Sequence, residues 1–138
     1  MTDSPSHEVI AGDPGRGLIL IADHASNAVP ACYGRLGLPE TEFARHIAYD
    51  IGIAAVTRGL SARLGVPAIL SCFSRLLIDP NRGLDDPTLI MRISDGAVVP
   101  GNARIDEAER LARIARFYRP YHAAITAAIA AGQATGRA

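Results

Sequence analysis

The chain has 138 residues, of which 49% are hydrophobic, and its 14 basic residues balance 14 acidic ones. This predicts a single domain over residues 1–138 with flexible ends at 1–6 and 133–138, and the balanced charge favours neither a nucleic-acid partner nor an anionic membrane surface. Every basic residue is arginine, which excludes Schiff-base lysine chemistry, and without a long apolar run or a signal pattern we expect a cytoplasmic protein with no membrane contact.

The first part of the chain predicts two strands separated by a turn. Residues 7–10 are a short strand candidate, and the glycine-rich residues 12–17 are typical of a turn. Residues 18–22 form an unbroken apolar run, as in a buried strand of an α/β sheet. We expect these two strands to be neighbours.

A polar group follows the second strand, at Asp23, His24, Ser26 and Asn27. Open α/β sheets bind ligands just beyond the carboxyl ends of their strands, so His24 lies where a metal ligand or general base would be placed. The alternative is structural: the other three side chains cap the turn while His24 donates to a nearby carbonyl. Both interpretations stay open.

A long helix is predicted over residues 39–64, between Pro39 and a Gly-Val-Pro stop signal. It would place His46 and Asp50 one turn apart, a pair that most often marks a solvated face. Residues 68–73 are the next strand candidate. A strand, a helix and a strand make a crossover unit, so we expect this strand to run parallel to residues 18–22.

A third short strand is predicted at residues 76–78, framed by polar side chains. Arg75 precedes it, and Asp79, Asn81 and Arg82 follow it. A guanidinium offers a planar donor fork that fits a carboxylate, so this group is a candidate cradle for a small anionic substrate. The alternative is that an arginine merely pairs with Asp79 as a structural bridge.

The last part of the chain predicts a long helix over residues 106–131, kinked or divided at Pro120. Residues 88–93, before it, favour a strand or an apolar loop. His122 lies on a mostly apolar helix, where a histidine is more often a core residue than a ligand.

Five segments together resemble the N-formylglutamate amidohydrolase family, which is similar in architecture to zinc carboxypeptidases and aspartoacylases. In chain order these are DHASNAVP, AYDIG, SRLLIDPNR, VPGN and YRPYH. The resemblance runs from about residue 8 to residue 132. It implies a three-layer α/β/α fold of the phosphorylase/hydrolase-like type with a mixed, partly parallel central sheet. It also implies zinc-dependent hydrolysis of the amide of an N-acyl amino acid, releasing formate and glutamate in the named case.

The resemblance also implies a role for individual residues at a zinc site. His24 matches the metal ligand after the first strand. Asn27 occupies the position of a glutamate ligand in the wider superfamily, although a neutral amide is a poorer ligand. The resemblance assigns no role to Asp50, which is a catalytic candidate that would either support His24 or contact the substrate.

Substrate contacts follow from the same resemblance. Asn81 and Arg82 match the pair that holds the substrate carboxylate. Arg75 matches the arginine that polarises the scissile carbonyl and stabilises its oxyanion.

Members of this family are appreciably longer, and their second half supplies a metal histidine and, by analogy, a catalytic glutamate. The sequence is therefore expected to correspond to the N-terminal half of the fold. Three functions stay open: a zinc amidohydrolase acting on a small N-acyl amino acid, a non-catalytic carboxylate-binding module, or a fragment completed by a partner chain. That partner would be a missing C-terminal half or a second copy in a homo-oligomer.

Overall fold

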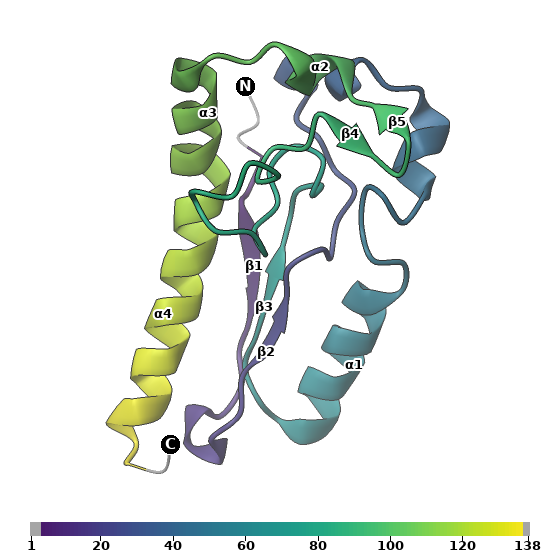
Figure 1. The fold of residues 1–138 in the computed structure, drawn as a ribbon. Helices are drawn as coiled ribbons and strands as arrows, with labels where there is room; N and C mark the ends of the chain where they lie inside the picture. Colours follow the sequence, from purple (N-terminus) through teal and green to yellow (C-terminus); the bar gives the residue numbers. More distant parts are fainter. Residues whose placement is uncertain (1–3, 137–138) are drawn as a thin grey trace.

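Three short strands form the central sheet in the computed structural model, which describes residues 4–136 (Figure 1). The strands are β1 (His7–Ile10), β2 (Leu20–Ala22) and β3 (Ala68–Ser71). Their order is β1-β3-β2, with β3 parallel to β2 and antiparallel to β1. The mixed, partly parallel sheet is therefore confirmed.

The prediction that the first two strands are neighbours is wrong, because β3 lies between them. The connection from β1 to β2 contains a single 3₁₀ turn, Pro14–Arg16. It is bonded to the segment before β3: the Asp13 N–H donates to the Gly65 carbonyl at 2.8 Å. Both outer strands thus bond to β3 rather than to each other.

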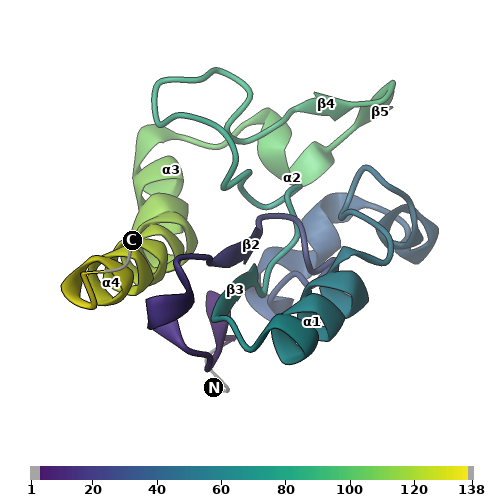
Figure 2. The ribbon, with the colours of Figure 1, turned by 90° about the horizontal axis from the view of Figure 1, so that it is seen from below.

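One helix covers each face of the sheet. Helix α1 (Ile53–Leu64) packs on one face and helix α4 (Arg119–Ala134) on the other (Figures 1 and 2). Alternate β3 residues serve the two faces: Ile69 belongs to the core cluster of Tyr121, whereas Leu70 joins the smaller cluster on the α1 side. This is the expected three-layer α/β/α arrangement.

The long helix predicted over residues 39–64 is wrong in its first half. Residues 31–44 contain only 3₁₀ segments, Ala31–Gly37 and Glu40–Ala44, and Gly52 has a left-handed φ of 84° just before α1. The Ala48 carbonyl accepts the Ser74 hydroxyl and the Arg75 N–H instead of a helical N–H. Tertiary bonds therefore replace the helix here, and Asp50 lies in a loop.

Residues 76–78 are fully buried but form no strand, which corrects the prediction. Side chains donate hydrogen bonds to their carbonyls in place of a neighbouring strand. Asn102 donates to the Leu76 carbonyl at 2.7 Å, and Arg113 donates to the Leu77 carbonyl at 3.0 Å. Residues 88–92, predicted as strand or apolar loop, are turn and loop. A small hairpin that was not predicted follows them, β4 (Ile93–Ser94) and β5 (Ala97–Val98).

The predicted C-terminal helix is present and continues through Pro120; the irregularity beside the proline is a π-helical turn, not a division. A short helix α2 (Pro100–Ala103) precedes α3 (Glu107–Arg113), and a π-helical turn (Ile114–Tyr118) joins α3 to α4. The wider π turn lies where the proline ring would crowd a regular helix.

Helix α4 reaches Ala134, inside the segment expected to be flexible. Of the predicted flexible ends, residues 1–3 and 137–138 lie outside the described residues. Within residues 4–136, no helix has both the length and the apolar character needed to cross a bilayer.

Candidate functional site

Three loops meet beyond the carboxyl ends of β2 and β3, and backbone hydrogen bonds hold them together. The Asp50 N–H donates to the His24 carbonyl at 2.9 Å, and the Arg75 N–H donates to the Ala48 carbonyl at 3.2 Å. The Ser74 N–H donates to the Ala28 carbonyl at 2.8 Å. The side chains after each strand are therefore positioned by main-chain bonds between loops that are distant in sequence.

His24 lies between two carboxylates at this junction. Its Nε2 is 2.7 Å from Oδ1 of Asp79, and its Nδ1 is 3.4 Å from Oδ2 of Asp50. The His24 and Asp79 side chains are buried, whereas that of Asp50 is 53% exposed. The structure thus brings His24 and Asp50 together as hypothesised, with Asp79 as an added partner.

Asp79 is the centre of the group. Its Oδ2 lies 3.1 Å from Nη2 of Arg75 and 3.8 Å from Nε of Arg82, while its Oδ1 also accepts the Asn81 N–H at 2.9 Å. Burial alone would raise the pKa of Asp79. The hydrogen bonds from His24 and Asn81, with the charge of Arg75, outweigh burial and lower that pKa below its ordinary value.

The sequence placed Asp79 either in the candidate cradle or in a structural bridge to an arginine, and it did not indicate a pairing with His24. The bond between Asp79 and His24 joins positions 55 residues apart, which no local pattern reveals. One signal was available: Asp79 is an acidic residue directly after a fully buried apolar run, where a carboxylate needs partners.

The two arginines differ in how much of each guanidinium is already bound. Arg75 bridges Asp79 and, at 3.7 Å, Oδ1 of Asp50, and its buried Nε has no hydrogen-bond partner. Arg82 is 43% exposed and, among the described residues, its guanidinium hydrogen-bonds no acceptor. Asn81 beside it is also exposed. The structural bridge therefore describes Arg75 best, while Arg82 and Asn81 offer unused donors.

Asn27 is not part of this group. Its Nδ2 donates to the Phe43 carbonyl at 2.7 Å, and among residues 4–136 no hydrogen bond joins it to His24. Asn27 also lines a separate cavity of about 230 Å³ with Val29 and Arg35. The amide therefore joins two loops of the scaffold.

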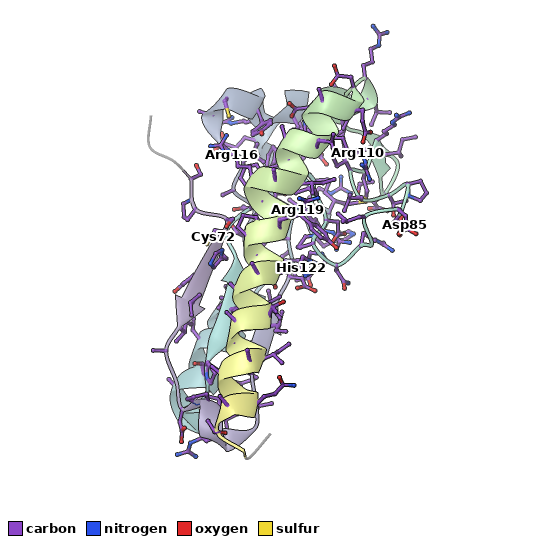
Figure 3. All side chains as sticks on the ribbon, turned by 90° about the vertical axis from the view of Figure 1, so that its left-hand side faces the viewer. Cys72, Asp85, Arg110, Arg116, Arg119 and His122 are labelled. Carbon is purple, nitrogen blue, oxygen red and sulfur yellow. The ribbon has the colours of Figure 1, made fainter. Side chains whose placement is uncertain are left out.

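Helix α4 and the π-helical turn before it hold the backbone of residues 80–82. His122 Nε2 lies 2.9 Å from the Pro80 carbonyl, and the Tyr118 hydroxyl donates to the Arg82 carbonyl at 2.8 Å. Figure 3 shows His122 and Arg119 on the side of α4 that faces the loop of Asp85. His122 thus positions the backbone of this segment, in line with the structural interpretation of this residue.

Two further features define what the site offers. In the part of the chain that the structure describes, no three His, Cys, Asp or Glu side chains are grouped so as to hold a metal ion. A cavity of about 400 Å³ lies elsewhere, between the loop after Asp85 and the start of α3, with Asp86, Arg92 and Arg110 in its lining. The His24 group, which comprises His24, Asp50, Arg75, Asp79 and Arg82, therefore lies at a different place from this cavity.

Comparison with known proteins gives one family match. The family model of N-formylglutamate amidohydrolase matches residues 16–138. No curated protein matches the sequence. Among solved structures, a gene product of Agrobacterium tumefaciens is 36% identical with a TM-score of 0.89, over 98% of this chain and 54% of that one. N-formylglutamate amidohydrolase from Ralstonia eutropha JMP134 is 28% identical with a TM-score of 0.65, over 96% of this chain and 54% of that one. The chain therefore spans about half the length of these two proteins.

Proposed function

We propose, because the chain belongs to the N-formylglutamate amidohydrolase family, that it takes part in hydrolysing the amide bond of an N-acyl amino acid such as N-formylglutamate. The observation that carries this proposal is the convergence of His24, Arg75 and Arg82 on the buried carboxylate of Asp79. A buried acid with these three partners is a costly arrangement that structural stability alone does not require.

Arg82 and Asn81 are the proposed contacts for the substrate carboxylate. Both side chains are exposed, and the Arg82 guanidinium lies beside Asp79 without a hydrogen-bonded acceptor among the described residues. A free guanidinium fork binds a carboxylate in a bidentate manner, which a lysine ammonium does not reproduce.

Arg75 is proposed to bind the oxygen of the scissile amide. Its side chain is only 21% exposed and its guanidinium is held by Asp79 and Asp50, so it needs little reorganisation to stabilise a developing oxyanion. The buried, unpartnered Nε is a donor that the folded chain leaves unused.

His24 is proposed as a ligand of the zinc that the family implies. The donor chemistry fits: Asp79 binds one ring nitrogen and leaves the other with a lone pair, as is usual for metal-bound imidazole. Zinc, when bound, polarises a carbonyl and lowers the pKa of its bound water to about 7. A catalytic zinc takes three protein ligands, and residues 4–136 group fewer than three. We therefore expect the 138-residue chain to bind substrate without rapid turnover.

Calorimetric titration with N-formylglutamate tests the proposal, with formate release measured in the same samples with and without added zinc. We expect N-formylglutamate to bind, and its diamide, in which both carboxylates are neutral amides, to bind much more weakly. Equal affinity for the two compounds, or no binding of either, would contradict the proposal. Rapid zinc-dependent formate release would show that the metal site is more complete than residues 4–136 indicate.

A further inference from the structure

The two ring nitrogens of His24 face carboxylates at different distances. Nε2 lies 2.7 Å from Asp79, within hydrogen-bonding range, whereas Nδ1 lies 3.4 Å from Oδ2 of Asp50, beyond it. An ionised carboxylate only accepts, so the Nε2 hydrogen is donated to Asp79 and the neutral ring has its lone pair on Nδ1. Nδ1 and the Asp50 oxygen are then two acceptors facing one another, an arrangement that is stable with a cation between them.

The separation of these two acceptors fits two ligands of one metal ion. Zinc binds imidazole nitrogen at about 2.0–2.1 Å and carboxylate oxygen at about 2.0–2.2 Å, so two ligands at a tetrahedral angle lie about 3.3–3.5 Å apart. The observed 3.4 Å lies within this range. The 2.7 Å contact to Asp79 is too short for that geometry and is a hydrogen bond.

Asp50 is also held in place for this role, and Asn27 is not. The Asp50 N–H donates to the His24 carbonyl, which fixes the two residues side by side. Its Oδ1 faces Arg75 at 3.7 Å, leaving Oδ2 toward His24. The Asn27 amide donates to the Phe43 carbonyl instead.

We propose that Asp50, rather than Asn27, is the second protein ligand of the metal that His24 binds. The ion is a divalent cation that accepts mixed nitrogen and oxygen donors, as zinc does. Asp50 is half exposed, so the remaining positions around the ion open toward solvent and substrate. This inference rests on the proposed function, because it assigns a ligand to the metal centre invoked there.

Cobalt spectroscopy of cysteine variants tests the ligand assignment directly. A thiolate that binds Co²⁺ gives an intense near-ultraviolet charge-transfer band, whereas a thiol near the metal but not bound to it gives none. We expect this band in Asp50→Cys with Co²⁺ and not in Asn27→Cys, and we expect adding His24→Ala to Asp50→Cys to remove it. The unaltered protein, which already has free Cys32 and Cys72, is the blank.

Zinc titration by calorimetry gives a second measurement on conservative variants. Asp50→Asn and His24→Ala should each weaken zinc binding by more than about 10-fold. Losing a residue that only supports a ligand already weakens metal binding by at least about 10-fold, and losing a ligand itself should cost more. Asn27→Ala should retain the affinity of the unaltered protein. Asp95→Asn is a matched control, because Asp95 faces His46 at 3.7 Å on the exposed surface, where no second carboxylate of residues 4–136 pairs with that ring. Thermal unfolding without metal establishes that each variant is folded.

The outcomes separate this inference from the proposed function. If the unaltered protein binds zinc and Asn27→Ala, not Asp50→Asn, abolishes binding, the Asp50 assignment is wrong and the metal centre stands. A cobalt charge-transfer band in Asn27→Cys alone leads to the same conclusion. If the unaltered protein binds no zinc, both the metal centre and the Asp50 assignment are rejected.

Discussion

Arg82 is the residue on which substrate recognition most depends. Its side chain is anchored on one side by Asp79 and is otherwise exposed. Asp79 itself remains bound to His24 and Arg75 if Arg82 is removed. Substitution of Arg82 should therefore affect the ligand far more than the fold.

Arg82→Ala should weaken binding of N-formylglutamate by about 2–5 kcal/mol, because it leaves the bound carboxylate without its charged partner. Arg82→Lys should restore little of this, since a point charge does not reproduce the fork. Calorimetry measures both affinities, and Arg45→Ala, which removes an arginine paired with Glu42 and Asp95, is the control. Unchanged affinity in Arg82→Ala would exclude Arg82 from the site.

Tyr121 provides a test of stability against pH. Its fully buried hydroxyl donates to Asp23 at 2.6 Å, and burial together with that bond raises the pKa of Tyr121 well above 10.0. Above pH 10 the unfolded tyrosine loses its proton while the folded one keeps it. The folded state then holds more protons, so stability falls as pH rises.

Tyr121→Phe should accordingly lose about 1.5–3 kcal/mol of unfolding free energy near pH 8, the contribution of a hydrogen bond to a charged group. Above pH 10, the unfolding free energy of this variant should decline less steeply with pH than that of the unaltered protein. Tyr33 and Tyr118, whose pKa values are also raised, are present in both proteins, so the difference reports Tyr121. Urea unfolding across this range would contradict the account if the two curves stayed parallel.

Residues 76–78, which precede Asp79, are held in place by hydrogen bonds from side chains instead of by a sheet. Asn102 is fully buried and donates to the Leu76 and Met91 carbonyls, and its Oδ1 accepts a hydrogen bond from the buried Arg113. These bonds satisfy carbonyls that a neighbouring strand would otherwise take. They also fix the direction in which the chain enters the site.

Asn102→Ala should therefore destabilise the fold by about 3 kcal/mol, at about 1 kcal/mol for each of the three bonds lost. Asn27→Ala is the matched control, because it removes one bond from an exposed asparagine. Chemical denaturation of both variants measures the difference. A loss in Asn102→Ala no larger than in the control would show that the segment is held in another way.

What the sequence could predict depended on whether the responsible contacts were local. The buried strand β3, its parallel pairing with β2 and the C-terminal helix follow from apolar runs and helical spacing, and they were predicted. The second predicted buried strand, at residues 18–22, is shorter and partly exposed. The helix break before Gly52 and the missing strand at residues 76–78 depend on bonds to Ser74, Asn102 and Arg113, which lie far away in the sequence.

The candidate site divides in the same way. His24, Asp50, Arg75 and Arg82 were found by motif, and the structure gathers them beside Asp79. The pairing of His24 with Asp79 depends on tertiary folding and was missed. Asn27 shares a motif with His24 but is turned to the Phe43 carbonyl, so proximity in sequence was misleading there.

The molecule as a whole has a sheet whose β2 edge is unpaired among the described residues. Leu18 and Ile21 are 44% and 46% exposed there, and a cavity of about 220 Å³ beside them is lined by Leu18, Ile19 and Ile129. An apolar, unpaired edge favours association with another strand. The solved relatives, which are nearly twice as long, have further chain available to cover such an edge.

The 138-residue protein should therefore self-associate as its concentration rises, and Ile21→Lys should shift it toward monomer. Val56→Lys is the matched control, because Val56 is 55% exposed and lies on α1 instead of on the strand. Sedimentation velocity measures the distribution. Equal association of the Ile21→Lys and Val56→Lys variants would show that the β2 edge is not the contact.

We expect an N-acyl amino acid to bind at the His24 group and not in the 400 Å³ cavity near Arg110. Titration of ¹⁵N-labelled protein with N-formylglutamate, followed by amide chemical shifts, locates the ligand without assuming activity. We expect the largest changes at His24, Asp50, Arg75 and residues 79–82. Changes centred instead on Asp86, Arg92 and Arg110, with the His24 group unaffected, would contradict this expectation.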